Sequence, residues 1–236
     1  MPSHIHDKQH NRLLADLPRE DRSRLTSRGE RVRLSSGSVL FDADEHVRHA
    51  FFPLSGMVSI ISTTPAGKSV VIAAVGPEGM AGLPVILGDG RSPYQAMAQC
   101  PLDAVRISAR SLHTEFDRGG RFKELLLSHA LTLLTQVTQS ASCHRFHTVE
   151  QRLARWLLTT RDRAGSDRFR LTQEFLSFML GVPRTSVTSL AAAMQAKGLI
   201  AYSRGSITVI DSEGLEATSC DCYGVIRREI ERQFAA

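Results

Sequence analysis

The chain of 236 residues is 42% hydrophobic and 22% charged, which is typical of a globular protein with a buried core, and its length favours two domains over one. No early segment has the pattern of an export signal, and the four cysteines do not make the disulfide framework of a small secreted protein, so we expect a cytoplasmic location. The net charge of +5 is concentrated in residues 145–210, where ten basic side chains stand against four acidic ones, as a polyanionic partner requires.

The N-terminal half is predicted to be two short helices followed by many short strands. Residues 10–28 place leucines at the apolar positions of one or two helices: Leu13, Leu14, Leu17 and Leu25. From Glu30 to Ser111, β-prone runs alternate with turn residues: VRL, SVLF, HAFFPL, GMVSIIST, KSVVIAAVG, YQAMAQC and DAVRIS. Strands at this spacing predict a jelly-roll-like β-barrel, and the glycine-rich passage 76–90 is a plausible ligand loop.

One long helix is predicted from about Gly120 to Arg145. Its stretch 125–144 contains no Asp, Glu, Lys or Arg, yet it has too many Ser, Thr, Gln and His side chains for a membrane span. Apolar residues cover so much of this helix that several of its sides must be buried. We expect the β-domain to cover one side and a second copy of the helix to cover another. Burial inside a monomer is the alternative. The expected dimerisation stripe is Phe122, Leu126, Leu133 and Val137.

Residues 171–200 have the pattern of a helix-turn-helix. Thr172 is a good cap for the first helix, Gly181 suits the left-handed conformation of the turn, and Pro183 suits the start of the second helix. An ordinary helical hairpin is the alternative. Small and apolar residues at matched offsets on both sides of the glycine favour a DNA-binding motif.

The segments around this motif fit the same interpretation. A hinge at 144–148 is followed by an amphipathic helix at 149–163. After the motif, residues 199–210 have the pattern of strand, Arg204-Gly205 turn and strand, which is the wing of a winged helix. Residues 211–236 are predicted to form a tail that ends in a charged helix.

A β-roll, a long helix and a winged helix-turn-helix in this α+β order resemble the Crp/Fnr family of bacterial transcription regulators. The resemblance implies an effector-sensing domain at 1–119, a dimerisation helix and hinge at 120–146, and a DNA-binding domain with a tail at 147–236. It also implies a homodimer that binds a palindromic promoter site on double-stranded DNA and contacts RNA polymerase. A small effector in the β-roll would shift the long helices and so set the spacing of the DNA-binding helices.

The resemblance assigns DNA contacts residue by residue. Arg184 falls where the family commonly has an arginine that reads guanine. Thr185 and Ser189 stand where members that read the commonest half-site have glutamate and a second arginine, so we expect a different half-site. The candidates for phosphate contacts are Thr172, Thr185, Ser186, Lys197 and Arg204.

Half of a cyclic-nucleotide site is present. Gly90-Arg91-Ser92 matches the family's Arg-Ser pair for the phosphate, and Thr138 lies near where the long helix meets the base. The Gly-Glu pair for the ribose is missing, because Met80-Ala81 stands at its place and Glu78-Gly79 has the reverse order. No cofactor is assigned with certainty, and cyclic-nucleotide binding stays open.

Two other functions are compatible with parts of the sequence. Cys143, His144 and His147 at the hinge would meet Cys220 and Cys222 if the tail folded back, which would make a redox- or metal-responsive switch. The spacing matches no standard zinc pattern, so no metal ligand is assigned, and Cys143 as a small buried apolar residue is the alternative. A cupin-like enzyme is disfavoured, because residues 30–112 contain only two histidines and no nucleophile–base pair. We therefore expect no enzymatic activity.

Overall fold

The structure is a computed structural model and describes residues 10–203 and 205–235. Its N-terminal part begins with two short helices, α1 (Arg12–Ala15) and α2 (Arg19–Thr26). All four leucines predicted to be buried here are buried. Asn11 caps α1 and also donates from Nδ2 to the carbonyl oxygens of Pro53 and Gly79, which ties the first helix to the strands that follow.

The seven predicted strands are all present. They are β1 (Gly29–Leu34), β2 (Val39–Phe41), β3 (His49–Ser55), β4 (Val58–Thr63), β5 (Ser69–Val75), β6 (Gln95–Ala98) and β7 (Leu102–Ser108). They form two antiparallel sheets, in the orders β1-β7-β3 and β2-β6-β4-β5, around one apolar core. The jelly-roll-like β-domain is therefore confirmed, although hydrogen bonds do not close the two sheets into a barrel.

The passage between β5 and β6 is irregular, as predicted, and contains the short 3-10 helix η1 (Leu83–Val85). A helix that the sequence did not suggest, α3 (Ala109–Asp117), follows β7. Its N-cap is Ser108, whose hydroxyl accepts the backbone N–H of Ser111. This cap was visible in the sequence, but the short helix after it was not recognised.

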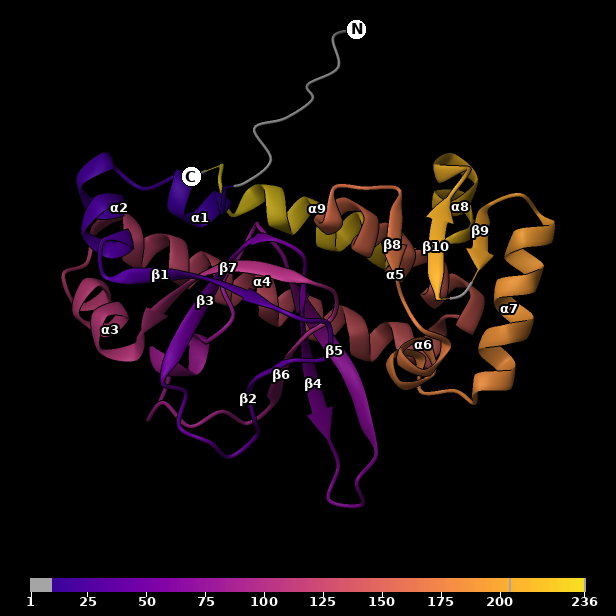
Figure 1. Ribbon diagram of the computed structural model, residues 1–236, viewed down its shortest axis with the longest axis horizontal. Coiled ribbons are helices and arrows are strands. Elements are labelled where there is room, and N and C mark those ends of the chain that lie inside the picture. The colour runs from indigo at the N-terminus through magenta and orange to yellow at the C-terminus, as the bar shows by residue number, and fades with distance from the viewer. Residues whose placement is uncertain (1–9, 204, 236) are drawn as a thin grey trace, which may run out of the picture.

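The long helix α4 (Gly120–Phe146) confirms the predicted element and runs along the β-roll toward the second domain (Figure 1). The dimerisation stripe needs correction. Phe122, Leu126 and Leu133 are buried in the core of their own β-roll, and Val137 packs against that core while half-buried. The leucines that α4 exposes are Leu127, Leu131 and Leu134. No helix in the described parts of the chain has the length and apolarity needed to cross a bilayer.

The C-terminal domain starts with α5 (Val149–Ala164), which has a capping box formed by Thr148 and Gln151. The predicted helix-turn-helix follows as α6 (Gln173–Leu180) and α7 (Arg184–Ala196), and the predicted wing as β9 (Ile200–Ser203) and β10 (Ser206–Val209). A third strand, β8 (Arg168–Arg170), was not anticipated and completes the wing sheet in the order β8-β10-β9.

The C-terminal segment is a packed part of the fold and not a free tail. It consists of α8 (Ser212–Thr218), which packs on α5, and α9 (Cys222–Arg232), which packs on α4. The end of α9 lies beside α1 (Figure 1). There the Arg12 guanidinium pairs with the Glu231 carboxylate at 2.8 Å, and Phe234 packs against the β-roll core. The segment thus connects the two domains a second time, alongside α4.

Candidate nucleic-acid interface and effector pocket

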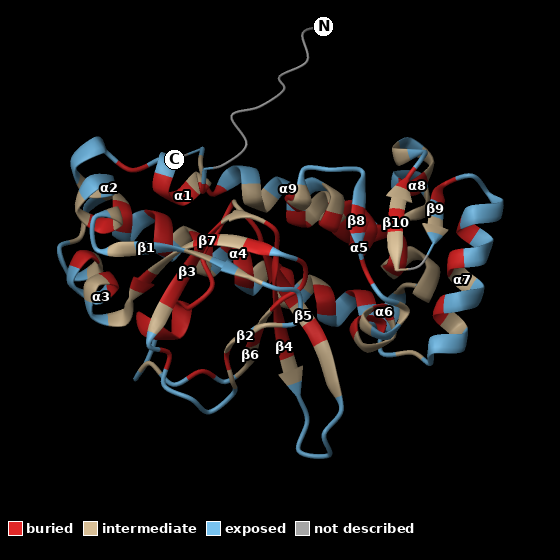
Figure 2. Cartoon of the chain, viewed as in Figure 1, coloured by how far each residue is buried: buried red, intermediate tan, exposed pale blue. Residues whose placement is uncertain are grey.

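The helix-turn-helix is shaped by a few local interactions. The Thr172 hydroxyl accepts the backbone N–H of Phe175 at 3.1 Å and so caps α6, as expected. Gly181 has φ of +66°, the left-handed conformation that ends α6. Pro183 is the N-cap of α7, one residue before the helix proper. The inner face of α7 buries Val187, Ala191 and Met194, which leaves the opposite face to solvent (Figure 2).

The exposed face of α7 carries the expected polar side chains. Arg184, Thr185 and Ser189 are exposed, and Ser186 is half-buried at the first turn. Within the described residues no carboxylate lies in ion-pair distance of Arg184, so its five donors are available to a ligand. Arg184 is also the first residue of a 13-residue helix, where the free backbone N–H groups favour an anion.

One residue of this face was missed. Thr188 is exposed one turn after Arg184, and its hydroxyl lies 3.0 Å from the Arg184 carbonyl oxygen and 3.2 Å from Oε1 of Gln173 on α6. The i, i+4 spacing from Arg184 was the signal that could have identified it.

The basic residues outside α7 that were considered for phosphate contacts differ in how free they are to bind. Lys197 lies beyond the end of α7 and its Nζ pairs with Glu150 at 2.7 Å, so a phosphate would have to compete with that carboxylate. Arg204 lies outside the described residues. Two further basic residues were missed: Arg168 and Arg170 are exposed on β8, on either side of the buried Phe169. Their alternation with one apolar residue is the strand pattern that the sequence offered.

The residues expected to hold an effector are only partly assembled. Arg91 is exposed and donates to the carbonyl oxygen of Asp44, and its Nη2 lies 3.4 Å from Nε2 of His46. The Ser92 hydroxyl is buried and donates to the Tyr94 carbonyl oxygen at 2.6 Å. Thr138 is exposed on α4, and its hydroxyl bonds to the Leu134 carbonyl oxygen at 2.7 Å. Of this set, only Arg91 borders a cavity next to α4.

That cavity has a volume of about 240 Å³ and lies between the β-roll and α4. Its lining is apolar except for Arg91 and the phenol of Tyr94: Ile60, Ile72, Ala73, Leu83, Pro84, Leu87, Pro93, Leu133, Leu134 and Val137. Burial raises the pKa of Tyr94, so that phenol stays neutral. The cavity therefore offers an apolar surface with one positive charge at its edge.

Both domains of the chain resemble families of known proteins. Residues 31–118 match the cyclic nucleotide-binding domain family, and residues 151–218 match the Crp-like helix-turn-helix domain family. Over 198 residues the chain is 25% identical to a CRP-like cAMP-activated global transcriptional regulator of Mycobacterium tuberculosis, with 81% of this chain and 88% of that protein covered. The chain belongs to the Crp/Fnr family. It is a Crp-like transcriptional regulator with a helix-turn-helix DNA-binding domain.

Solved structures show the same fold at low identity. A Crp/Fnr-family regulator of Eubacterium rectale has a TM-score of 0.68 at 19% identity, over 88% of this chain and 97% of its own. FixK2 of Bradyrhizobium japonicum has a TM-score of 0.68 at 16% identity, over 81% and 98%. The c-di-GMP responsive global regulator CLP of Xanthomonas campestris has 0.66 at 16% identity, over 82% and 100%.

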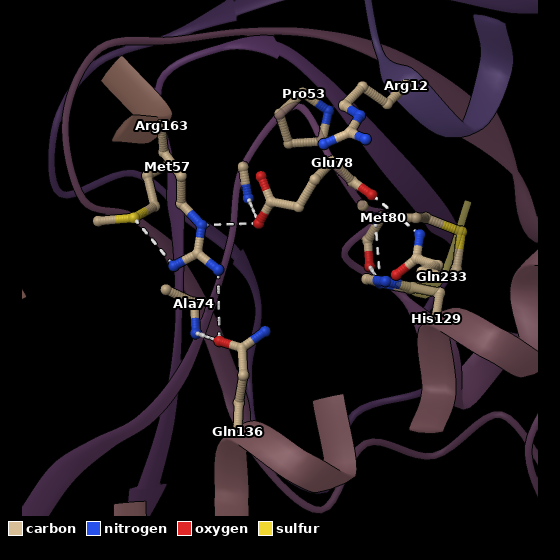
Figure 3. A network of polar contacts seen from close by, with 12 residues as sticks. Arg12, Pro53, Met57, Ala74, Glu78, Met80, His129, Gln136, Arg163 and Gln233 are labelled. Atoms are coloured by element: carbon tan, nitrogen blue, oxygen red, sulfur yellow. Dashed lines mark hydrogen bonds and ion pairs between the residues drawn. The ribbon is translucent and has the colours of Figure 1, made fainter. Parts of the chain in front are cut away.

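In this Crp/Fnr protein Glu78, in the irregular passage between β5 and β6, holds the two domains together. Glu78 is buried, and its Oε1 accepts from Nε of Arg163 on α5 at 2.6 Å and from the backbone N–H of Gly76 at 3.0 Å (Figure 3). Nη2 of Arg163 also lies 3.4 Å from Oε1 of Gln136 on α4. Glu78 therefore joins the β-roll to the DNA-binding domain and does not face the cavity.

The same region connects the β-roll to α4 and to the end of α9. Nε2 of Gln233 donates to the Glu78 carbonyl oxygen at 3.1 Å (Figure 3). His129 on α4 is fully buried with Nε2 3.1 Å from the backbone nitrogen of Met80, and burial lowers its pKa, so the imidazole is neutral. These contacts hold the ligand loop between both domains.

The hinge and the last helices bring together most of the residues considered for a switch. Cys143, Cys220, Cys222 and His147 meet, whereas Nδ1 of His144 bonds to the Ser140 carbonyl oxygen at 2.7 Å. The Cys143 thiol bonds to Cys220 Sγ, and together with nearby Arg155 this lowers the pKa of Cys220 to about 5. The sequence assigned no metal ligand here, because the spacing matches no standard zinc pattern; the convergence considered for a folded-back tail is present in the structure for four of the five side chains.

Proposed function

We propose that the protein binds a palindromic duplex site as a homodimer, and that a small effector in the β-roll modulates this binding. The observation that carries the proposal is the exposed face of α7, where Arg184 is free of any acidic partner within the described residues. An arginine can contact O6 and N7 of guanine together, which makes it suited to read a base pair in the major groove. Arg168 and Arg170 on β8, the third strand of the wing sheet, add positive charge for the flanking phosphates.

The proposed dimer forms through α4. Leu127, Leu131 and Leu134 are 48%, 54% and 60% exposed and follow one another at i, i+4 and i+7, so they form one apolar stripe. No Asp, Glu, Lys or Arg lies between residues 125 and 144, so two copies of the helix can pack without opposing like charges. Two-fold pairing would present two α7 helices to two half-sites of a palindrome.

The proposed effector differs from cyclic AMP. Two of the similar proteins already differ in their effector, since one is cAMP-activated and the other is c-di-GMP responsive. In this chain the cavity has one charged lining residue, Arg91, and the nearby glutamate is committed to Arg163. A small ligand with an apolar body and one anionic group fits this lining better than a ribose that needs polar partners. A contact with RNA polymerase at the promoter is proposed on family membership alone.

Selection from random duplexes tests the function. Purified, reduced full-length protein is incubated with the pool at near-physiological salt, and the retained duplexes are sequenced. We expect a two-fold symmetric site. Binding that stays non-specific and salt-sensitive, with and without cyclic nucleotides and small apolar carboxylates, would overturn the proposal. Light scattering on the same sample checks the dimer.

A further inference from the structure

Four side chains with metal-binding atoms meet at the hinge between the two domains. We call Cys143, His147, Cys220 and Cys222 the thiol cluster. Cys143 lies in the last turn of α4 and His147 is its C-cap, while Cys220 and Cys222 lie where α8 gives way to α9. None of them belongs to the DNA-binding face or to the cavity beside the β-roll.

Two distances in the thiol cluster are close to those of a tetrahedral site. All four candidate ligand atoms lie within 4.8 Å of one another. Sγ of Cys143 is 3.5 Å from Sγ of Cys220, and Sγ of Cys222 is 3.6 Å from Nδ1 of His147. With usual zinc–sulfur and zinc–nitrogen bond lengths, a tetrahedral centre separates two sulfurs by about 3.8 Å and a sulfur from a nitrogen by about 3.6 Å. The cysteines are free thiols, and the sulfur separation is far above the roughly 2.05 Å of a disulfide.

The ligand types in the thiol cluster and their burial indicate which metal would bind. Three thiols and one imidazole are the soft ligands that zinc prefers in closed structural sites. The three cysteines are buried and His147 is half-buried, and they form a cluster separate from the cores of both domains. Such a closed site leaves no open position for a substrate, so a structural role follows from the ligand count.

The charges around the thiol cluster supply an independent argument. Arg155 on α5 is only 6% exposed, no described carboxylate lies in ion-pair distance of it, and its Nε has no hydrogen-bond partner. Arg155 is close enough to act electrostatically on all three thiols. A buried guanidinium without a carboxylate partner needs another negative charge nearby, and the thiolates of this cluster are the groups that can supply it. Three thiolates around a dipositive ion carry a net charge of −1, which would provide that counter-charge.

We propose that Cys143, His147, Cys220 and Cys222 bind one zinc ion in a tetrahedral Cys₃His site that fastens α9 to the hinge between α4 and α5. Binding releases the protons of those ligands that are still protonated and changes no oxidation state. Because α9 packs along α4 and its end contacts the β-roll, the ion fixes the orientation of the DNA-binding domain. That consequence for DNA rests on the proposed function, whereas metal binding does not.

Metal analysis of the reduced full-length protein is the first test. We expect one zinc per chain, and after exchange to cobalt(II) an absorption spectrum with thiolate-to-cobalt charge transfer and intense tetrahedral bands. Cys143→Ser, Cys220→Ser, Cys222→Ser and His147→Asn should each weaken zinc binding by more than tenfold. The matched controls are Cys100→Ala, a buried cysteine outside the thiol cluster, and His144→Asn, the neighbouring histidine that bonds elsewhere. Both controls should keep the metal.

Several results would overturn this assignment. Wild-type protein without zinc, and without thiolate bands when cobalt(II) is added, excludes the site. Iron with acid-labile sulfide would replace it by an iron–sulfur cluster. A Cys143–Cys220 disulfide that forms under mild oxidation in protein unable to bind zinc would make the cluster a redox element.

Two further measurements keep the test decisive if a cysteine variant fails to fold. Zinc added to metal-free wild-type protein should raise the unfolding temperature, and equally so for Cys100→Ala, because the ion binds the folded state. An unchanged temperature in both proteins contradicts the proposal. Loss of DNA binding after chelation, restored by zinc, supports the role at the hinge. Zinc binding in a protein that never binds DNA would overturn the proposed function and leave the metal site standing.

Discussion

The helix-turn-helix and the β-roll cavity differ in how many of the family's binding residues they keep in place. In the helix-turn-helix, Thr172 caps α6, Gly181 makes the turn and Arg184 opens the exposed face of α7. In the β-roll, only Arg91 reaches the cavity, while Glu78 pairs with Arg163 of the other domain. The DNA-binding motif is contiguous in sequence, so local interactions fix it. The effector site is assembled from distant segments, and one redirected side chain changes what it can bind.

Breaking the Glu78–Arg163 pair should have the largest effect. Arg163→Ala leaves a buried carboxylate without its partner, and we expect it to lower the free energy of unfolding by about 3–5 kcal/mol. Urea denaturation followed by circular dichroism measures this. Arg161→Ala, which removes the exposed pair with Asp167, is the control and should cost about 1 kcal/mol or less. A mild effect of Arg163→Ala would mean that Glu78 is free to serve a ligand.

Sequence-specific DNA binding by the helix-turn-helix should depend on Arg184. We expect Arg184→Ala to remove about 1–3 kcal/mol of discrimination between the selected duplex and a scrambled one. Competition binding at fixed salt gives the ratio. Arg168→Ala should weaken the binding of both duplexes alike. It should also reduce the slope of log affinity against log salt concentration by about 1, as expected for the loss of one phosphate contact. If Arg184→Ala keeps its preference, Arg184 does not read bases.

The helix that both domains share should respond to a charge on its exposed stripe. Leu131→Glu places two carboxylates in the proposed dimer interface, and we expect the dimer to weaken by at least about tenfold, or about 1.4 kcal/mol. Sedimentation velocity over a range of concentrations measures the change. Ile210→Glu, at a residue that is 62% exposed away from α4, should leave the assembly unchanged. Equal behaviour of the two variants would place the interface elsewhere.

The smallest expected effect is on the pH dependence of stability, through the buried His129 between α4 and the β-roll. The pKa of His129 is lowered chiefly by burial, so the folded protein keeps it neutral while the unfolded chain takes up a proton below about pH 6.5. Stability should therefore fall as pH drops from 7.5 to 5.5, with a limiting slope of about 1.4 kcal/mol per pH unit from this residue. His129→Gln should flatten the curve. Identical pH profiles for the two proteins would show that the pKa of His129 is the same in the folded and the unfolded chain, against the effect of burial.

Much of the fold was predictable because its signals are local. The seven strands and both helices of the DNA-binding motif follow from alternation, turn residues and caps within a few positions. The sides of α4 could not be assigned from periodicity. Leu126 and Leu127 are equally apolar, and only the position of the β-roll decides that the first is buried and the second exposed.

What the sequence could not show depends on contacts between distant segments. Glu78 is 85 residues from Arg163, and Cys143 is 77 residues from Cys220, so no spacing rule connects either pair. The charged helix at the end of the chain was expected as part of a tail, because its own pattern does not reveal that α4 is its partner. The residue types at the Glu78–Arg163 and Cys143–Cys220 contacts were visible in the sequence, but the distances between these side chains were not.

The return of α9 to α1 has a consequence for how the chain is made. Glu231 pairs with Arg12, and Phe234 packs on the β-roll core. The β-roll is synthesised first, so it lacks both contacts until α9 and Phe234 have left the ribosome. A nascent chain therefore carries an unfinished apolar patch while the entire DNA-binding domain is translated.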